Sequence, residues 1–104
     1  MKREVVWSRK AGRDLDAIVA FLTERNPRAA ERAAERIVHS TELLGDFATG
    51  HRGRVEGTFE KPIPSLPYIV LYEIVAEPDG RERIGILRVV HSARDWREGE
   101  APPE

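Results

Sequence analysis

The dipeptide Asn26-Pro27 separates two helical patterns and is the feature that most constrains how this chain of 104 residues can fold. Asparagine is a favoured helix N-cap, and proline fits the first helical turn because its missing N–H would have no partner there. Apolar residues recur at helical spacing over residues 11–22 and again over residues 30–44. Two helices joined by so short a connection are expected to pack as an antiparallel hairpin.

After Gly50 the apolar residues alternate, which predicts strands instead of helices. Together with a short opening strand, the expected strands cover residues 3–7, 52–61, 68–75 and 83–91. The turn residues Glu77–Gly80 join the last two into an antiparallel hairpin. The order β-α-α-β-β-β predicts an α+β fold, with the helical hairpin on one face of an antiparallel sheet.

Composition indicates one domain over residues 1–97 and an acidic, flexible tail over 98–104. The tail holds three of the 18 acidic residues, which leaves 15 acidic against 17 basic residues in the domain. Such an even balance of charges does not by itself indicate nucleic-acid binding. The sequence has no cysteine and no long apolar run, so we expect a cytoplasmic protein without a disulfide, a thiolate metal site or a membrane partner.

Arg88 stands out because it lies inside the apolar run of the last strand. Alternation places Arg88 on one face with Ile86, while His91 lies on the other face. Burying an unpaired arginine is costly, so Arg88 either lies on an open face or pairs with Glu73 or Glu60. His91 ends the strand, where it is either a general base or a structural histidine bonded to a carbonyl.

Aromatic and basic residues near these two suggest a surface that binds a partner. Tyr68 and Tyr72 lie four residues apart and either stack on nucleobases or fill the sheet as half-buried residues. Trp7 and Trp96 are expected to anchor the ends of the domain. Individually the other arginines are expected to be solvated, but together they could form one basic surface for an anionic partner, namely Arg52, Arg54, Arg81, Arg83, Arg88 and Arg94.

Helical spacing on the second helix predicts ion pairs between Glu31 or Glu35 and the arginines at 28, 32 and 36. No histidine spacing suggests a metal site. The sequence also has no glycine-rich phosphate loop and no nucleophile motif. The residues alone therefore indicate a small α+β domain whose sheet bears Arg, His and Tyr side chains.

The order and spacing of several short motifs resemble the RelE/ParE superfamily of toxins from bacterial type II toxin–antitoxin modules. The resemblance covers about residues 4–97 and matches the fold predicted above. No single motif is diagnostic; together they are Trp7-Ser8, Asp14-Leu15, Asn26-Pro27, Gly53-Arg54-Val55, Gly57-Thr58, Glu60, Pro67-Tyr68-Ile69-Val70, Tyr72, Ile86-Leu87-Arg88-Val89, His91 and Trp96.

The resemblance implies one of two activities. RelE-like members are ribosome-dependent endoribonucleases that cut mRNA, whereas ParE-like members poison DNA gyrase without catalytic residues. This chain is more similar to the ParE-like branch, because Pro64 lies near the position where RelE-like members place a catalytic arginine. Phe59 likewise stands where many relatives carry arginine. The net charge of −1 also suits a ribosome-bound protein poorly.

Whether the chain is an enzyme is left open by the resemblance. A ribonuclease would use His91 as general acid or base, with Arg88, Arg94 and Tyr72 around the scissile phosphate. Otherwise the residues expected to contact a partner are Arg54, Tyr68, Tyr72, Arg88, His91, Arg94 and Trp96.

Partners implied by the resemblance are a cognate antitoxin, whose C-terminal segment wraps the toxin, and either DNA gyrase or the ribosome with mRNA. No cofactor is expected. A third alternative is an inactive member that only binds its antitoxin.

Overall fold

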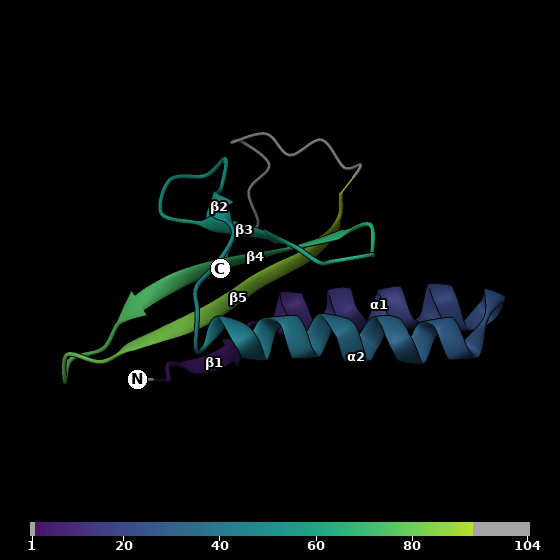
Figure 1. Cartoon of the computed structure of the whole chain (residues 1–104), viewed down its shortest axis with the longest axis horizontal. Coiled ribbons are helices and arrows are strands. Elements are labelled where there is room, and N and C mark those ends of the chain that lie inside the picture. The colour runs from purple at the N-terminus through teal and green to yellow at the C-terminus, as the bar shows by residue number, and fades with distance from the viewer. Residues whose placement is uncertain (1, 93–104) are drawn as a thin grey trace.

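A computed structural model describes residues 2–92 as two helices and five strands in one layered unit (Figure 1). Both helices lie on one face of the sheet. In chain order the elements are β1 (Glu4–Trp7), α1 (Arg9–Arg25), α2 (Pro27–Leu44), β2 (His51–Arg52), β3 (Phe59–Pro62), β4 (Tyr68–Ala76) and β5 (Glu82–His91).

Side-chain capping fixes where the two helices begin. The Ser8 hydroxyl accepts a hydrogen bond from the Ala11 N–H at 3.0 Å, which starts α1. The Asn26 side chain accepts from the N–H groups of residues 28 and 29 at 3.1 and 3.2 Å. Pro27 then occupies the first turn of α2, so the connection predicted from Asn26-Pro27 is confirmed.

The sheet has the strand order β1-β5-β4-β3-β2 and is mixed. The α+β class and the helical hairpin on a sheet are confirmed, but the prediction of a wholly antiparallel sheet is wrong. β1 pairs with β5 in parallel, from Glu4 opposite Arg83 to Trp7 opposite Ile86. The strand expected over 52–61 is also two strands, β2 and β3, separated by a loop.

Close backbone contact holds β1 beside the end of α2. The Arg3 N–H donates to the Gly45 carbonyl at 2.7 Å. A Cβ atom at Gly45 would lie 2.6 Å from the Arg3 carbonyl oxygen, well inside van der Waals contact. Glycine is therefore required where α2 ends against β1.

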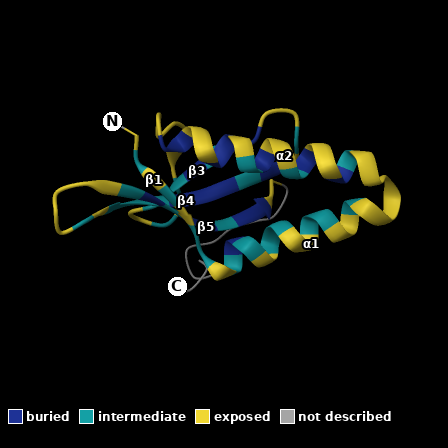
Figure 2. Cartoon of the chain, turned by 90° about the horizontal axis from the view of Figure 1, so that it is seen from below, coloured by how far each residue is buried: buried dark blue, intermediate teal, exposed yellow. Residues whose placement is uncertain are grey.

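Most of the core lies between the helices and the sheet, where the buried residues of β4, β5 and α2 meet (Figure 2). α2 contributes more to this core than α1, in which only Ala11 is fully buried. A second, smaller apolar cluster comprises Leu71, Leu87 and Val90, with Ile69 packed against it. Figure 2 shows that the helical turn far from the sheet is exposed.

A β-bulge changes which residues of β5 share a face. The register shifts between Leu71 and Tyr72, so that Leu71 lies opposite Arg88 and Tyr72 lies opposite Ile86. The prediction that side chains alternate regularly over 84–91 is therefore wrong. β5 has one extra residue at the bulge, which moves every later side chain to the opposite face of the sheet. As a result, Val89 joins Ile84 and Ile86 in the helix-facing core, while Arg88 pairs across the strands with Leu71.

Of the regions predicted from the sequence, the tail over 98–104 lies outside the described residues, as do Arg94 and Trp96. Within residues 2–92 neither helix is long and apolar enough to cross a membrane.

We expect Asn26→Ala to lower the free energy of unfolding by about 1 kcal/mol, because the two bonded N–H groups at the start of α2 lose their acceptor. Urea unfolding followed by circular dichroism measures this change. Asn26→Asp is the matched control, since aspartate also caps and should remain within about 0.5 kcal/mol of wild type. Equal losses in both variants would contradict the capping role.

Candidate functional site

Arg88 forms a bidentate ion pair with Asp14 of α1. Its Nε donates to Asp14 Oδ2 at 2.6 Å, and its Nη2 donates to Oδ1 at 3.0 Å. The two side chains are only 17% and 16% exposed. Paired guanidinium and carboxylate groups in this geometry are strong and directional, so the pair ties α1 to β5.

Asp14 also replaces a strand partner. β1 ends at Trp7, which leaves the edge of β5 beyond Ile86 without a neighbouring strand. Ser8 donates its N–H to the Ile86 carbonyl and its hydroxyl to the Leu87 carbonyl, both at 2.9 Å. The Val89 N–H then donates to Asp14 Oδ2 at 2.9 Å. Consecutive backbone groups of β5 are thus satisfied by the start of α1.

The prediction that Arg88 pairs with Glu73 or Glu60 is wrong, because Arg88 pairs with Asp14. Glu73 instead lies across from Gly85, where its side chain approaches that glycine closely. Glu60 is buried at 7% exposure, and one of its oxygens accepts the Arg54 N–H at 3.2 Å. Glu60 therefore holds the loop that joins β2 to β3, in which Arg54 is exposed.

Tyr72 is a core side chain with 0% exposure. Its ring stacks on that of Phe59, with 5.4 Å between centroids. Its hydroxyl donates to the Thr49 carbonyl at 2.6 Å, which fastens the segment after α2 to the sheet. Burial raises the pKa of this hydroxyl above its ordinary value of about 10, and the positive charge of Arg3 acts in the opposite direction.

Tyr68 and His91 lie opposite each other at the ends of β4 and β5. Tyr68 is buried, and the exposed His91 ring meets it edge-to-face with 5.6 Å between centroids. Tyr68 and Tyr72 both belong to the helix-facing core and are buried, so the expectation of half-buried tyrosines is wrong. Of these three side chains, His91 is the one that presents its ring to solvent.

Three of the six arginines expected to form one basic surface lie apart and face acids. Arg81 and Arg83 lie at the tip of the β4–β5 hairpin, where they pair with Asp79 at 3.4 Å and Glu77 at 3.3 Å. Arg88 lies at the opposite part of β5 and is bound to Asp14. Arg81 and Arg83 therefore do not join Arg88 in one basic surface, while Arg52 and Arg54 are exposed and Arg94 lies outside the described residues.

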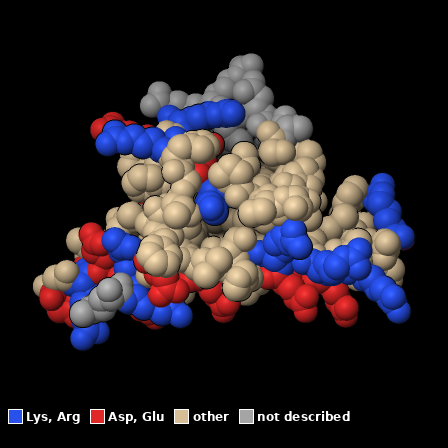
Figure 3. All heavy atoms as spheres, in the orientation of Figure 1, with Lys and Arg blue, Asp and Glu red and all other residues tan. Residues whose placement is uncertain are grey.

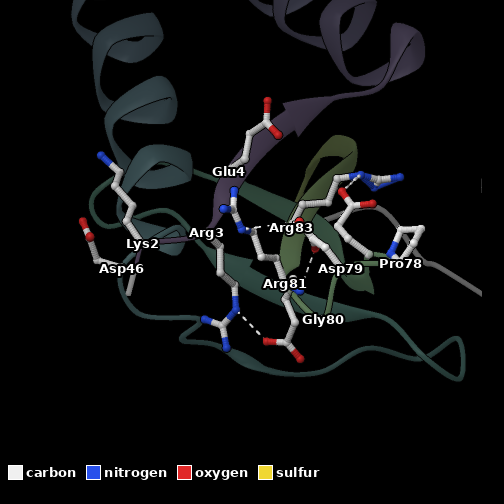
Figure 4. Close-up of a pocket in the computed structure, with 11 residues that line it drawn as sticks. Lys2, Arg3, Glu4, Asp46, Pro78, Asp79, Gly80, Arg81 and Arg83 are labelled. Atoms are coloured by element: carbon white, nitrogen blue, oxygen red, sulfur yellow. Dashed lines mark hydrogen bonds and ion pairs between the residues drawn. The ribbon is translucent and has the colours of Figure 1, made fainter.

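A wide hollow of about 880 Å³ lies between the N-terminal residues and the β4–β5 hairpin tip (Figure 4). Its lining alternates in charge, and Arg3 pairs with Glu82 across it at 2.9 Å. In Figure 4, dashed lines mark the hydrogen bonds and ion pairs among the side chains that line the hollow. A site whose charges neutralise each other offers no strong recognition of a charged small molecule.

The described candidates therefore occupy separate environments instead of one catalytic constellation. Arg88 faces Asp14, Tyr72 faces Thr49, and His91 packs on Tyr68. No group of three His, Cys, Asp or Glu side chains within residues 2–92 could hold a metal ion.

Sequence reasoning did not single out Asp14 as the partner of Arg88, although Asp14-Leu15 is among the motifs that resemble the superfamily.

Comparison with known proteins identifies the class to which this fold and site belong. A family model described as the ParE toxin of the type II toxin–antitoxin system parDE matches residues 5–96. Y4kP of Sinorhizobium fredii, which is named as a toxin, is 31% identical over 96 residues that cover 91% of this chain and 94% of Y4kP. Toxin RelE2 of Caulobacter vibrioides is 32% identical over 92 residues, covering 88% of this chain and 97% of RelE2.

Solved structures agree with this class. The chromosomal ParDE system from P. aeruginosa contains a chain that superposes with a TM-score of 0.76 at 26% identity, over 86% of this chain and 96% of that one. A chain of the RelBE2 complex from Mycobacterium tuberculosis superposes with a TM-score of 0.51 at 24% identity, over 88% and 99% of the two chains, and supports the fold alone. The molecule is thus a toxin of the RelE/ParE superfamily. Within that superfamily, the chain belongs to the ParE toxin family of type II toxin–antitoxin systems.

We expect Asp14→Ala to lower the free energy of unfolding by about 3 kcal/mol, because it leaves a mostly buried guanidinium and the Val89 N–H without this acceptor. Urea unfolding measures the loss. Asp16→Ala on the exposed side of α1 is the matched control and should change stability by less than about 0.5 kcal/mol. Similar stabilities for the two variants would contradict the role given to Asp14.

The raised pKa of Tyr72 predicts a loss of stability at alkaline pH. The unfolded tyrosine ionises near pH 10, while the folded one keeps its proton to higher pH. Because the folded state then binds more protons, the free energy of unfolding falls as pH rises past about 10. Tyr72→Phe lacks this term, so its deficit relative to wild type should shrink between about pH 8 and about pH 10.5. Urea unfolding at each pH tests this, and a constant or growing deficit would contradict it.

Proposed function

We propose that this ParE-family toxin acts on DNA gyrase in the cytoplasm, arrests growth, and is neutralised by a cognate antitoxin. The observation that carries the proposal is the structural use of the polar sheet residues. Arg88 is bound to Asp14, and the Tyr72 hydroxyl is bonded to Thr49 inside the core. A ribonuclease would need such groups at the scissile phosphate, so their engagement elsewhere favours a toxin that works by binding.

The loop before β4 supports the same proposal. Pro64 occupies the region where the resemblance places a catalytic arginine in RelE-like members, and its carbonyl accepts a hydrogen bond from Arg36 at 3.3 Å. Proline supplies no positive charge for a developing phosphate transition state. The likeness to a ParDE toxin–antitoxin structure points in the same direction.

The antitoxin part of the proposal is supported by the shallow packing of α1. Leu15, Ile18 and Leu22 are only half-buried, and Phe21 is 51% exposed. An apolar helix surface of this kind suits a partner segment that folds on binding and covers it. We therefore place the C-terminal segment of the antitoxin along α1 and the adjoining sheet.

One observation favours the alternative of an mRNA endoribonuclease. His91 is exposed at the end of β5, and a relative named toxin RelE2 is 32% identical to this chain. In that case His91 would be the general acid or base.

We expect His91→Ala to leave growth arrest unchanged when the toxin is expressed without antitoxin, because a gyrase-directed toxin needs no proton transfer. Wild type should induce DNA-damage signalling and filamentous cells while early protein synthesis continues. Growth curves, a DNA-damage reporter and pulse labelling of new protein measure these effects.

His39→Ala is the matched control, since His39 is an exposed histidine on α2. Loss of toxicity in His91→Ala alone, with an unchanged circular dichroism spectrum and an early halt of translation in wild type, would support the ribonuclease instead. A wild-type protein that binds antitoxin but never arrests growth would identify an inactive member.

A further inference from the structure

The solvent-exposed side of α2 is divided by charge. Residues four apart lie on neighbouring turns of one helix face, so Arg28, Arg32 and Arg36 form a row. The acidic residues of the helix, at 31, 35 and 42, lie on the other side of the exposed face. Figure 3 shows basic side chains gathered along the helical hairpin with acidic side chains below them. This separation makes one side of α2 basic in a molecule with a net charge of −1.

Intramolecular partners do not neutralise this arginine row. Of residues 2–92, no carboxylate lies within ion-pair distance of Arg28, Arg32 or Arg36, so the expected pairs with Glu31 and Glu35 are not formed. The Arg36 side chain donates instead to the Pro64 carbonyl, which is uncharged. Like charges at this spacing destabilise a helix slightly.

Two exposed apolar residues continue the row, Leu43 in the last turn of α2 and Phe47 just after the helix. Leu43 lies seven residues, or two turns, after Arg36 and is 48% exposed. The Phe47 N–H donates to the Leu43 carbonyl at 2.9 Å, which places Phe47 on the next turn, and its side chain is 72% exposed. A large aromatic side chain this exposed is unusual on a protein surface that has no partner.

We propose that this stripe, defined as Arg28, Arg32, Arg36, Leu43 and Phe47, binds an acidic segment of the antitoxin that also carries an apolar anchor. The proposal rests on the antitoxin partnership proposed above and extends the contact from α1 to α2. Carboxylates of the segment pair with the arginines, and an aliphatic or aromatic side chain packs on Phe47.

The shape and composition of the stripe favour a polypeptide over a nucleic acid as its partner. An 18-residue helix is about 27 Å long, which suits one extended or helical segment of a wrapping chain. Arginine and phenylalanine at opposite ends match residue types enriched at protein interfaces. A nucleic acid would use the arginines for its phosphates but would leave the exposed Phe47 side chain without a function.

The test compares Arg28→Gln/Arg32→Gln with the matched control Glu31→Gln/Glu35→Gln, which removes two charges from the acidic side of the same helix. The probe is the purified product of the reading frame adjacent to the toxin gene, with binding measured by titration calorimetry. The arginine variant should bind about fivefold more weakly, and less steeply with salt, while the glutamate variant stays within about twofold of wild type. Phe47→Ser should also weaken binding.

Each result decides between specific alternatives. Equal affinities for wild type and the arginine variant would overturn the proposal, as would equal losses in both double variants. An arginine variant that binds antitoxin normally but no longer arrests growth would overturn it as well, and would assign the stripe to the target. Failure of wild type to bind the adjacent product would instead remove the proposed antitoxin partnership itself.

Discussion

The Asp14 carboxylate completes the edge of the sheet at the point where β1 stops. β1 has 4 residues and β5 has 10, so the edge of β5 that faces away from β4 has no neighbouring strand beyond Ile86. Asp14 accepts the Val89 N–H from that edge and holds Arg88 in the same geometry. Since an unpaired backbone group at a half-buried edge is costly, this single carboxylate fixes both the end of β5 and the position of α1.

The local elements could be predicted because each has a local physical cause. Asn26-Pro27 both caps and begins α2, and the turn residues 77–80 lie between two runs of apolar residues. What could not be predicted depends on contacts between distant residues. The direction of β1 is decided by β5, about 80 residues later, and the bulge opposite Leu71 reverses the faces that alternation assigned.

The candidate site shows the same division at the level of side chains. Arg88 and Tyr72 attract attention because polar atoms interrupt apolar strands. A buried polar group with a satisfied partner gives the same sequence pattern as a functional group, since both are polar residues among apolar ones. The structural role is recognised only once Asp14 is seen beside Arg88 and the Thr49 carbonyl beside Tyr72. Both partners are distant in the sequence, so the residues around Arg88 and Tyr72 do not indicate them.

Because Arg88 and Tyr72 stabilise the fold itself, partner recognition is expected to rely mainly on other residues. The helices are suited to this role because the sheet needs only one side of each, above all the buried stripe of α2 that contains Ile37 and Leu44. Substitutions of Arg28 and Phe47 would therefore leave the core intact. Replacing Arg88, by contrast, would leave the mostly buried Asp14 carboxylate without its cationic partner. Partner specificity in this chain is therefore expected to reside on the solvent side of the helical hairpin, and the sheet mainly sets the position of that surface.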